Sequence, residues 1–203
     1  PQTATVIVRP DALIRTYPQG ITETLRLFDG QDVVEVEVRG ARGDVTLQLA
    51  GETVVHVRSG QGVDEYAATQ EGDASAVDHI VVGRSGNRFL IAVGSSREAA
   101  RTHYDQAVAA APAWQEARSA RLTAVISGDH YFWSDDLRLT QALRWLQLTT
   151  DWLVTRQRGD GIYAGLPWFN EYWGRDSFIP GSIDYHTTDG TPRWVIALRD
   201  HVR

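Results

Sequence analysis

Aromatic rings and an adjacent Arg–Asp pair crowd into one stretch near the end of the sequence. From Gly165 to Phe178, the order GLPWFNEYWGRDSF supplies two Trp, two Phe, one Tyr, two acidic residues and one Arg. The C–H faces of a sugar ring stack on aromatic rings. Its hydroxyls accept hydrogen bonds from a guanidinium fork and donate them to a carboxylate. These residue types at this spacing predict a sugar-binding subsite.

A structural alternative stands beside this interpretation, because aromatic-rich loops also plug the ends of helical bundles and a neighbouring Arg–Asp pair can be a satisfied salt bridge. Trp145 and Trp152 fall on one helix face and are expected in the core. The segment RSGQGVDE lacks the Lys and the strand-to-helix setting of a phosphate loop. Four histidines lack the spacing of a zinc site: His103, His130, His186 and His201.

Composition narrows the function classes. The chain has 203 residues and a net charge of −6, which predicts one or two domains and no nucleic-acid partner. There is no Cys, which excludes disulfides and thiolate metal sites. No apolar run is long enough to span a bilayer, and the first residues lack the pattern of a signal peptide. We therefore expect a cytoplasmic protein with no membrane partner.

Two further residue types, Lys and Met, are absent. All 20 basic residues are Arg and none is Lys, a usage that indicates a GC-rich bacterial genome. Met is absent even at position 1, so we expect this chain to be a segment of a longer protein.

The first 94 residues have the period-two pattern of strands. Short runs that alternate Val with polar residues are bounded by Gly or Asp at intervals of about 8–12 residues, which is typical of an antiparallel sandwich. We therefore predict an N-terminal antiparallel β-sandwich domain over residues 1–94. Its clearest strands are Asp32–Gly40, Asp44–Gly51, Thr53–Gly60, Asp78–Gly86 and Arg88–Gly94.

The period changes after Gly94, and linker helices are predicted over residues 95–127. Ser95 stands three residues before Glu98, as in a capping box, and begins a helix that is expected to end at Pro112. A second helical stretch, AWQEARSARLTAVI, follows.

A longer helix of about 20 residues is predicted after Ser134, with Asp135 and Asp136 favouring its N-terminus. A last helix is predicted from Pro192. The longer helix is predicted to be amphipathic with a broad apolar face, from residues at i, i+3, i+4 and i+7 spacing: Leu139, Leu143, Trp145, Leu146, Thr149, Trp152 and Leu153.

The aromatic segment also resembles a known signature. AGLPWFNEYWGRDSFIPG, residues 164–181, is similar to a motif in the amylo-α-1,6-glucosidase half of glycogen debranching enzymes. YWGRDS more distantly resembles a stretch of glucoamylases. Both families have an (α/α)6 barrel, and bacterial members often place a β-sandwich and a linker helix before it. The resemblance implies that residues 128–203 are the incomplete start of such a glycosidase barrel.

The resemblance also implies roles for the motif. Arg175 and Asp176 would bind hydroxyls of the glucose in the −1 subsite, Trp173 would form a wall of the pocket, and Trp168 with Phe169 would add aromatic lining. The catalytic acid and base of the family come from later loops, beyond Arg203.

A different pairing follows from the residues alone. Glu171 and Asp176 could be the two carboxylates of a glycosidase, which in an inverting enzyme lie roughly 6.5–9.5 Å apart. The neighbouring Arg175 should lower the pKa of Asp176 and make it a poor proton donor. We therefore favour a binding role for Asp176 and keep the pair as a fallback.

The expected function is that of an inverting glycoside hydrolase, a debranching-type α-1,6-glucosidase. Its partner would be an α-glucan or oligosaccharide substrate, and no metal or organic cofactor is implied. Two alternatives stay open: a non-catalytic carbohydrate-binding protein, and a sister glycosidase or disaccharide phosphorylase on the same scaffold.

Overall fold

The computed structural model describes residues 4–70, 73–128, 134–155 and 161–162. The chain divides into two compact units, Pro1–Leu122 and Thr123–Arg203, and each is described by itself. No helix within the described ranges combines the length and apolar character that crossing a membrane requires.

Antiparallel strands make up most of the first unit, as the sequence predicts. Of the five predicted strands, four are confirmed, at Val33–Arg39, Val54–Gly60, Asp73–Ser85 and Arg88–Gly94. The strands before the first helix are β1 (Thr5–Val8), β2 (Leu13–Thr16), β3 (Thr22–Leu27), β4 (Val33–Arg39), β5 (Val54–Gly60), β6 (Val63–Gln70), β7 (Asp73–Ser85) and β8 (Arg88–Gly94).

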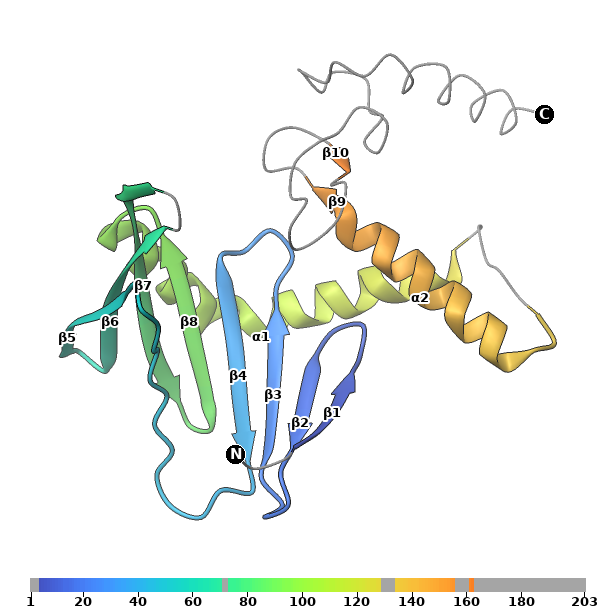
Figure 1. Cartoon of the computed structure of the whole chain (residues 1–203), viewed down its shortest axis with the longest axis horizontal. Coiled ribbons are helices and arrows are strands. Elements are labelled where there is room, and N and C mark those ends of the chain that lie inside the picture. Colours follow the sequence, from blue (N-terminus) through green and yellow to red (C-terminus); the bar gives the residue numbers. More distant parts are fainter. Residues whose placement is uncertain (1–3, 71–72, 129–133, 156–160, 163–203) are drawn as a thin grey trace. The chain divides into compact units, whose positions relative to one another are not determined.

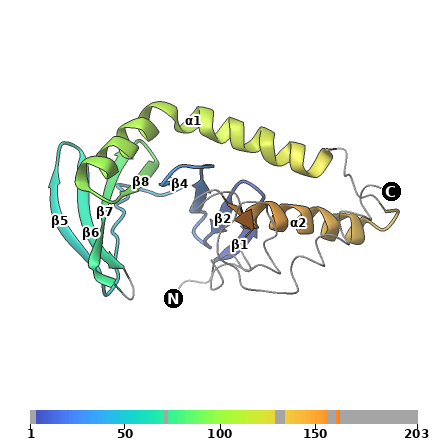
Figure 2. The ribbon, with the colours of Figure 1, turned by 90° about the horizontal axis from the view of Figure 1, so that it is seen from above.

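These strands form a single sheet in the order β1-β2-β3-β4-β8-β7-β6-β5 (Figure 1). The expected sandwich would stack two sheets face to face. Instead, strands β1 to β4 form one antiparallel meander and strands β5 to β8 form another. The two meanders join edge to edge, because β4 pairs with β8 from Val33↔Ala92 to Glu37↔Arg88. One helix, α1 (Arg97–Ser127), lies across one face of the sheet (Figures 1 and 2), so a second sheet is not needed to cover that face.

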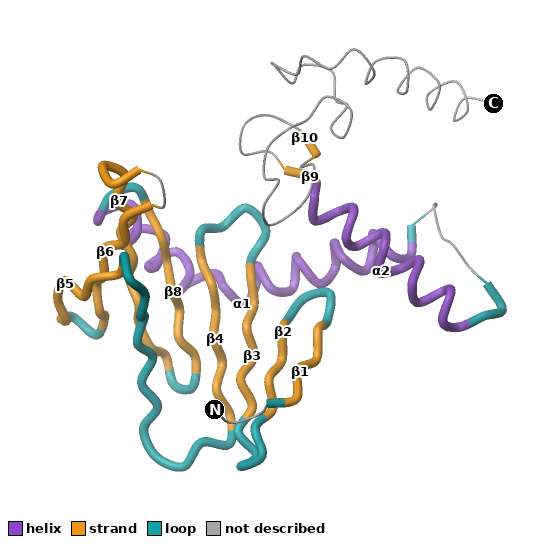
Figure 3. The backbone as a smooth tube through the Cα atoms, in the orientation of Figure 1, coloured by secondary structure: helices purple, strands orange, loops and turns teal. Residues whose placement is uncertain are grey.

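The segment Asp44–Gly51 is not the strand that its alternation predicted. Both edges of β4 are occupied by β3 and β8, and the connection from β4 to β5 runs as a loop (Figure 3). A hydrogen bond of 3.0 Å from Arg84 Nη1 to the Val45 carbonyl ties this loop to β7. The segment therefore cannot pair with the strand that it follows, and it does not pair with the outer edge of β5 either.

Helix α1 differs from its prediction at the N-terminus and in the middle. Ser96, not Ser95, is the capping residue, because its Oγ accepts a hydrogen bond of 3.1 Å from the Ala99 amide. The helix does not end at Pro112 but continues through it. A mid-helix Pro removes one hydrogen bond and crowds the preceding turn. Here apolar contacts of α1 with the sheet, before and after Pro112, hold the helix together.

Small residues let α1 approach the sheet closely. Ala100, Tyr104, Ala107 and Ala111 follow at helical spacing and are all buried, in a core shared with sheet residues that include Val81, Leu90 and Ala92. Further along the helix, Trp114 packs on Phe28 with ring centroids 5.6 Å apart.

In the second unit, α2 (Leu137–Leu153) begins later and is shorter than predicted, because Asp136, not Ser134, is its N-cap: the Asp136 side chain accepts from the Arg138 and Leu139 amides. The chain leaves the helix into β9 (Val154–Thr155), which pairs with β10 (Gly161–Ile162). Several side chains of the predicted apolar face are exposed, including Leu139 and Leu146, whereas Thr140 and Leu148 are buried. Trp145 and Trp152 contact each other edge to face at 6.1 Å. The predicted helix from Pro192 lies outside the described residues.

Candidate functional site

The predicted sugar-binding residues lie outside the part of the chain that the structure describes. This holds for Trp168, Phe169, Trp173, Arg175 and Asp176, and for the fallback carboxylate Glu171. Their roles remain predictions that follow from the motif. The described residues hold other charged clusters, and the largest lies in the middle of the sheet.

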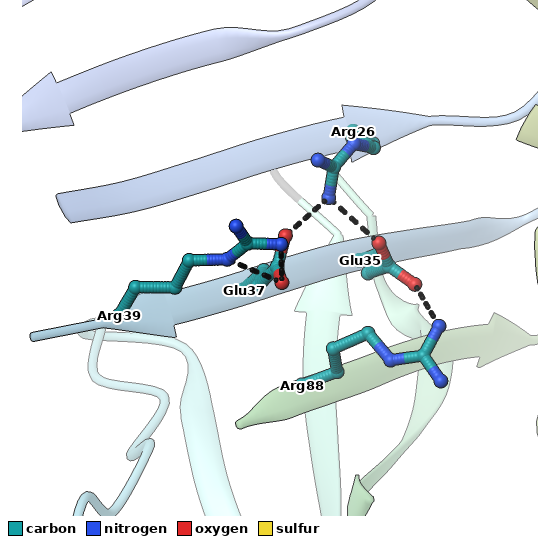
Figure 4. Close-up of polar contacts among 5 residues, drawn as sticks. All are labelled: Arg26, Glu35, Glu37, Arg39 and Arg88. Carbon is teal, nitrogen blue, oxygen red and sulfur yellow. Dashed lines mark hydrogen bonds and ion pairs between the residues drawn. The ribbon is translucent and has the colours of Figure 1, made fainter. Parts of the chain in front are cut away.

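Arg26 on β3, Glu35 and Glu37 on β4, and Arg88 on β8 form a network across three neighbouring strands (Figure 4). Strand geometry places the two glutamates on one face, because side chains two residues apart point the same way. Arg26 Nη1 donates to Glu35 Oε1 at 2.9 Å and to Glu37 Oε2 at 3.2 Å. Arg88 approaches the other oxygen of Glu35 at 3.6 Å.

Glu35 is the most buried member of the network. Its side chain is 3% exposed, and it lies beneath Ala107 and Ala111 of α1, beside a cavity of about 30 Å³. A carboxylate taken out of water needs charged partners and hydrogen bonds to remain ionised. The guanidinium groups of Arg26 and Arg88 supply that charge, so the network locks β3, β4 and β8 together.

Glu37 is held by two arginines. Burial raises the pKa of Glu37, but the hydrogen bonds from Arg39 and Arg26 outweigh burial and keep that pKa below its ordinary value. Glu37 is therefore an ionised hydrogen-bond acceptor. Because Glu35 is covered by α1, neither glutamate is suited to donate a proton to a substrate, although two carboxylates on one strand face invite comparison with a glycosidase pair.

Two further carboxylates fasten α1 to the sheet. Glu65 on β6 is buried and pairs with Arg97, the first residue of α1, at 2.5 Å, and with Arg58 at 2.7 Å. Near the other end of the contact, Asp29 in the turn after β3 pairs with Arg118 and Arg121 of α1. We call these two sets of ion pairs clamps. Each clamp joins α1 to a sheet-unit carboxylate far from it in sequence and fixes the position of the helix on the sheet.

The ion pairs of Asp29 and Glu37 predict a loss of stability in acid. Burial raises the pKa of Asp29, but the hydrogen bonds and charges of Arg121 and Arg118 lower it below its ordinary value of 3.8. The pKa of Glu37 is likewise below its ordinary 4.5. Groups with lowered native pKa values stabilise the fold above their unfolded values, and this contribution is lost as pH falls through the native values. We expect the urea midpoint to be steady above about pH 5 and to fall below about pH 4.

The substitution Asp29→Asn isolates the contribution of Asp29 to the pH dependence of stability. In Asp29→Asn the midpoint should be lower at neutral pH and should change less on acidification than in the wild type. Asp44→Asn is the matched control, since the Asp44 side chain is 96% exposed. Its urea midpoint should depend on pH as that of the wild type does. Equal profiles for wild type and Asp29→Asn would contradict the assigned role of this clamp.

Sequence reasoning missed these clusters. The alternation in VVEVEVR ordinarily marks one buried and one solvent-facing side, yet Glu35 and Val36 are both buried. The signal that could have found the network is the position of Arg26 and Arg88 on strands that flank β4, which requires the strand order. In the described part of the chain, no group of three or more His, Cys, Asp or Glu residues could hold a metal ion.

Comparisons with known proteins find no match to this chain among family models, curated proteins or solved structures.

Proposed function

We propose that the protein is an inverting glycoside hydrolase that acts on α-glucans, as a debranching-type α-1,6-glucosidase. The observation that carries the proposal is the segment of residues 164–181, which combines aromatic rings with an adjacent Arg–Asp pair and resembles the debranching-enzyme signature. The chemistry of these residue types matches a glucose ring, which has apolar faces and a hydroxyl rim.

Within this proposal, Arg175 and Asp176 hold the glucose and do not cleave its bond. The Arg175 guanidinium donates to sugar hydroxyls, and the ionised Asp176 carboxylate accepts hydrogen bonds from them. Trp173 forms a wall against the ring, and Trp168 with Phe169 extends the apolar surface. The catalytic acid and the base that activates water come from loops beyond Arg203.

The order of elements supports the proposal at a coarser level. An antiparallel β-rich unit precedes helices, which is the order that the family resemblance implies. In this proposal α2 is the first helix of an (α/α)6 barrel, and the motif follows it on the loop side.

The test is the hydrolysis of a branched α-glucan by the full-length protein, with any chain that lies beyond Arg203. We expect glucose to be released from α-1,6 branch points with inversion, so that the β-anomer appears first in the proton NMR spectrum. Initial release of the α-anomer would contradict the inverting route. Glucan binding without hydrolysis would favour the non-catalytic alternative, and cleavage that depends on phosphate would favour a phosphorylase.

A further inference from the structure

An open pocket of about 340 Å³ lies beside the charged network, on the face of the sheet that α1 partly covers. Its walls come from the turn after β1 and from strands β2, β3 and β4, and no α1 residue lines it. Register pairs Thr22 with Arg39 and Thr24 with Glu37, so these side chains share one face with Arg26. The volume is in the lower part of the range of small-molecule sites.

Hydrogen-bond donors outnumber acceptors in this pocket. Arg26 uses only Nη1 in its bonds to Glu35 and Glu37, and its Nε is buried without a partner. Arg39 uses Nε and Nη2 on Glu37 and keeps Nη1 for another acceptor. Among the described residues, the Arg9 guanidinium has no bonded partner. A guanidinium carries five N–H donors and no acceptor, so Arg9 and Arg39 present free donors to the pocket, whereas the Nε of Arg26 is shielded from solvent.

The acceptors are few by comparison. Glu37 is already taken by Arg26 and Arg39, and Asp11 is the other carboxylate in the lining. Glu35 outside the lining also pairs with Arg26, but it is shared with Arg88. Four guanidinium groups (Arg9, Arg26, Arg39 and Arg88) against three carboxylates (Asp11, Glu35 and Glu37) leave one net positive charge. The Thr22 and Thr24 hydroxyls can donate as well as accept. A ligand that complements this wall must be rich in acceptor oxygens and negatively charged.

We propose that this pocket binds a phosphate group, either as free phosphate or as part of a small phosphorylated sugar. A phosphate offers acceptor oxygens in several directions, and Arg is the side chain best suited to bind them in pairs. Arg9 from the turn and Arg39 from β4 reach the anion from two sides, and Thr24 donates from the sheet. The space beyond one phosphate accommodates the attached sugar.

The site does not depend on the proposed glycosidase activity. The pocket is built entirely from residues of the first unit. Its test compares phosphate binding by the wild type and an Arg9 variant, and it needs no hydrolysis. A failure here would leave the function of the aromatic segment untouched, and a failure of that function would leave this site standing.

Isothermal titration of the chain at constant ionic strength tests the proposal with three probes: inorganic phosphate, a hexose 6-phosphate and the unphosphorylated hexose. We expect saturable binding of at least one phosphorylated probe and none of the hexose. Tighter binding of the hexose phosphate identifies a sugar phosphate as the ligand, and equal affinities identify the bare anion. Absence of saturable binding by both phosphorylated probes, or hexose binding as tight as theirs, overturns the proposal.

Arg9→Gln is the decisive variant, because Arg9 is exposed and its substitution breaks no internal ion pair among the described residues. It should weaken phosphate binding about tenfold or more, as loss of a charge-assisted bond does. Arg15→Gln is the matched control, since Arg15 neighbours Ile14 on β2 but faces the other side of the sheet, where it pairs with Glu23. Equal weakening in both variants would show non-specific attraction and overturn the site.

Discussion

Gly83→Ala is expected to destabilise the sheet unit by about 1–3 kcal/mol, the usual cost of overfilling a packed core. A methyl group at Gly83 would lie 2.1 Å from the hydroxyl oxygen of Tyr104 and 2.3 Å from the ring carbon that bears it. Tyr104 is 8% exposed and lies between Ala100 and Ala107 in the core, so its ring has little room to move. The smaller unfolded-state entropy of Ala offsets only about 0.4–1 kcal/mol.

Urea unfolding followed by circular dichroism measures this effect. Gly60→Ala is the matched control, because Gly60 also lies in a strand and nothing would stand within 4 Å of its new methyl group. The cost of Gly83→Ala should largely disappear in a Tyr104→Ala background, since the clash requires the ring. An unchanged midpoint in Gly83→Ala would mean that α1 does not lie over β7 as described.

Trp173→Ala in the full-length protein is expected to cost roughly 2 kcal/mol or more of binding free energy for maltose, about a thirtyfold loss of affinity. An aromatic wall gives a sugar ring a large apolar contact, and truncating such an anchor leaves the ring face in water. The loss should appear in the dissociation constant measured by calorimetry, whatever the catalytic rate.

Trp152→Phe is the matched control for this experiment. Trp152 belongs to α2, is 37% exposed and contacts Trp145, and the proposal gives it no part in the sugar pocket. The variant should bind maltose as the wild type does. If Trp173→Ala also kept the wild-type affinity, the aromatic segment would have a structural role instead, and the sugar-binding interpretation would fail.

Local patterns predicted the elements better than their assembly. Alternation located β4, β5, β7 and β8, and the change of period located α1, because each of these depends on residues close in sequence. The same alternation misassigned Asp44–Gly51, since no property of that segment shows that both edges of β4 are occupied. The single sheet in place of a sandwich has the same origin, because it depends on the long-range β4–β8 pairing.

Local rules also failed where tertiary contacts outweighed them. Pro112 normally ends a helix, yet the burial of Tyr104 and Ala107 before it and the packing of Trp114 after it keep α1 continuous. The strands β1, β2, β3 and β6 were not predicted, although TETLRL and VDEYAATQ contain alternating runs.

The two candidate sites differ in what the sequence can supply. The proposed sugar-binding motif can be recognised from the sequence because its residues are contiguous, from Trp168 to Asp176. The phosphate pocket draws Arg9, Arg26 and Arg39 from three separate segments, and only the strand order brings them to one face. Sites of the second kind require the fold before they can be recognised.

The central claim is that a glucose unit lies against Trp168 and Trp173. The most direct measurement is a maltose titration of the isotope-labelled full-length protein, followed through the indole N–H resonances. We expect saturable shifts for Trp168 and Trp173, while the resonance of Trp114, packed on Phe28 in the sheet core, stays in place. Indole resonances of Trp168 and Trp173 that do not move at saturating maltose would contradict the central claim.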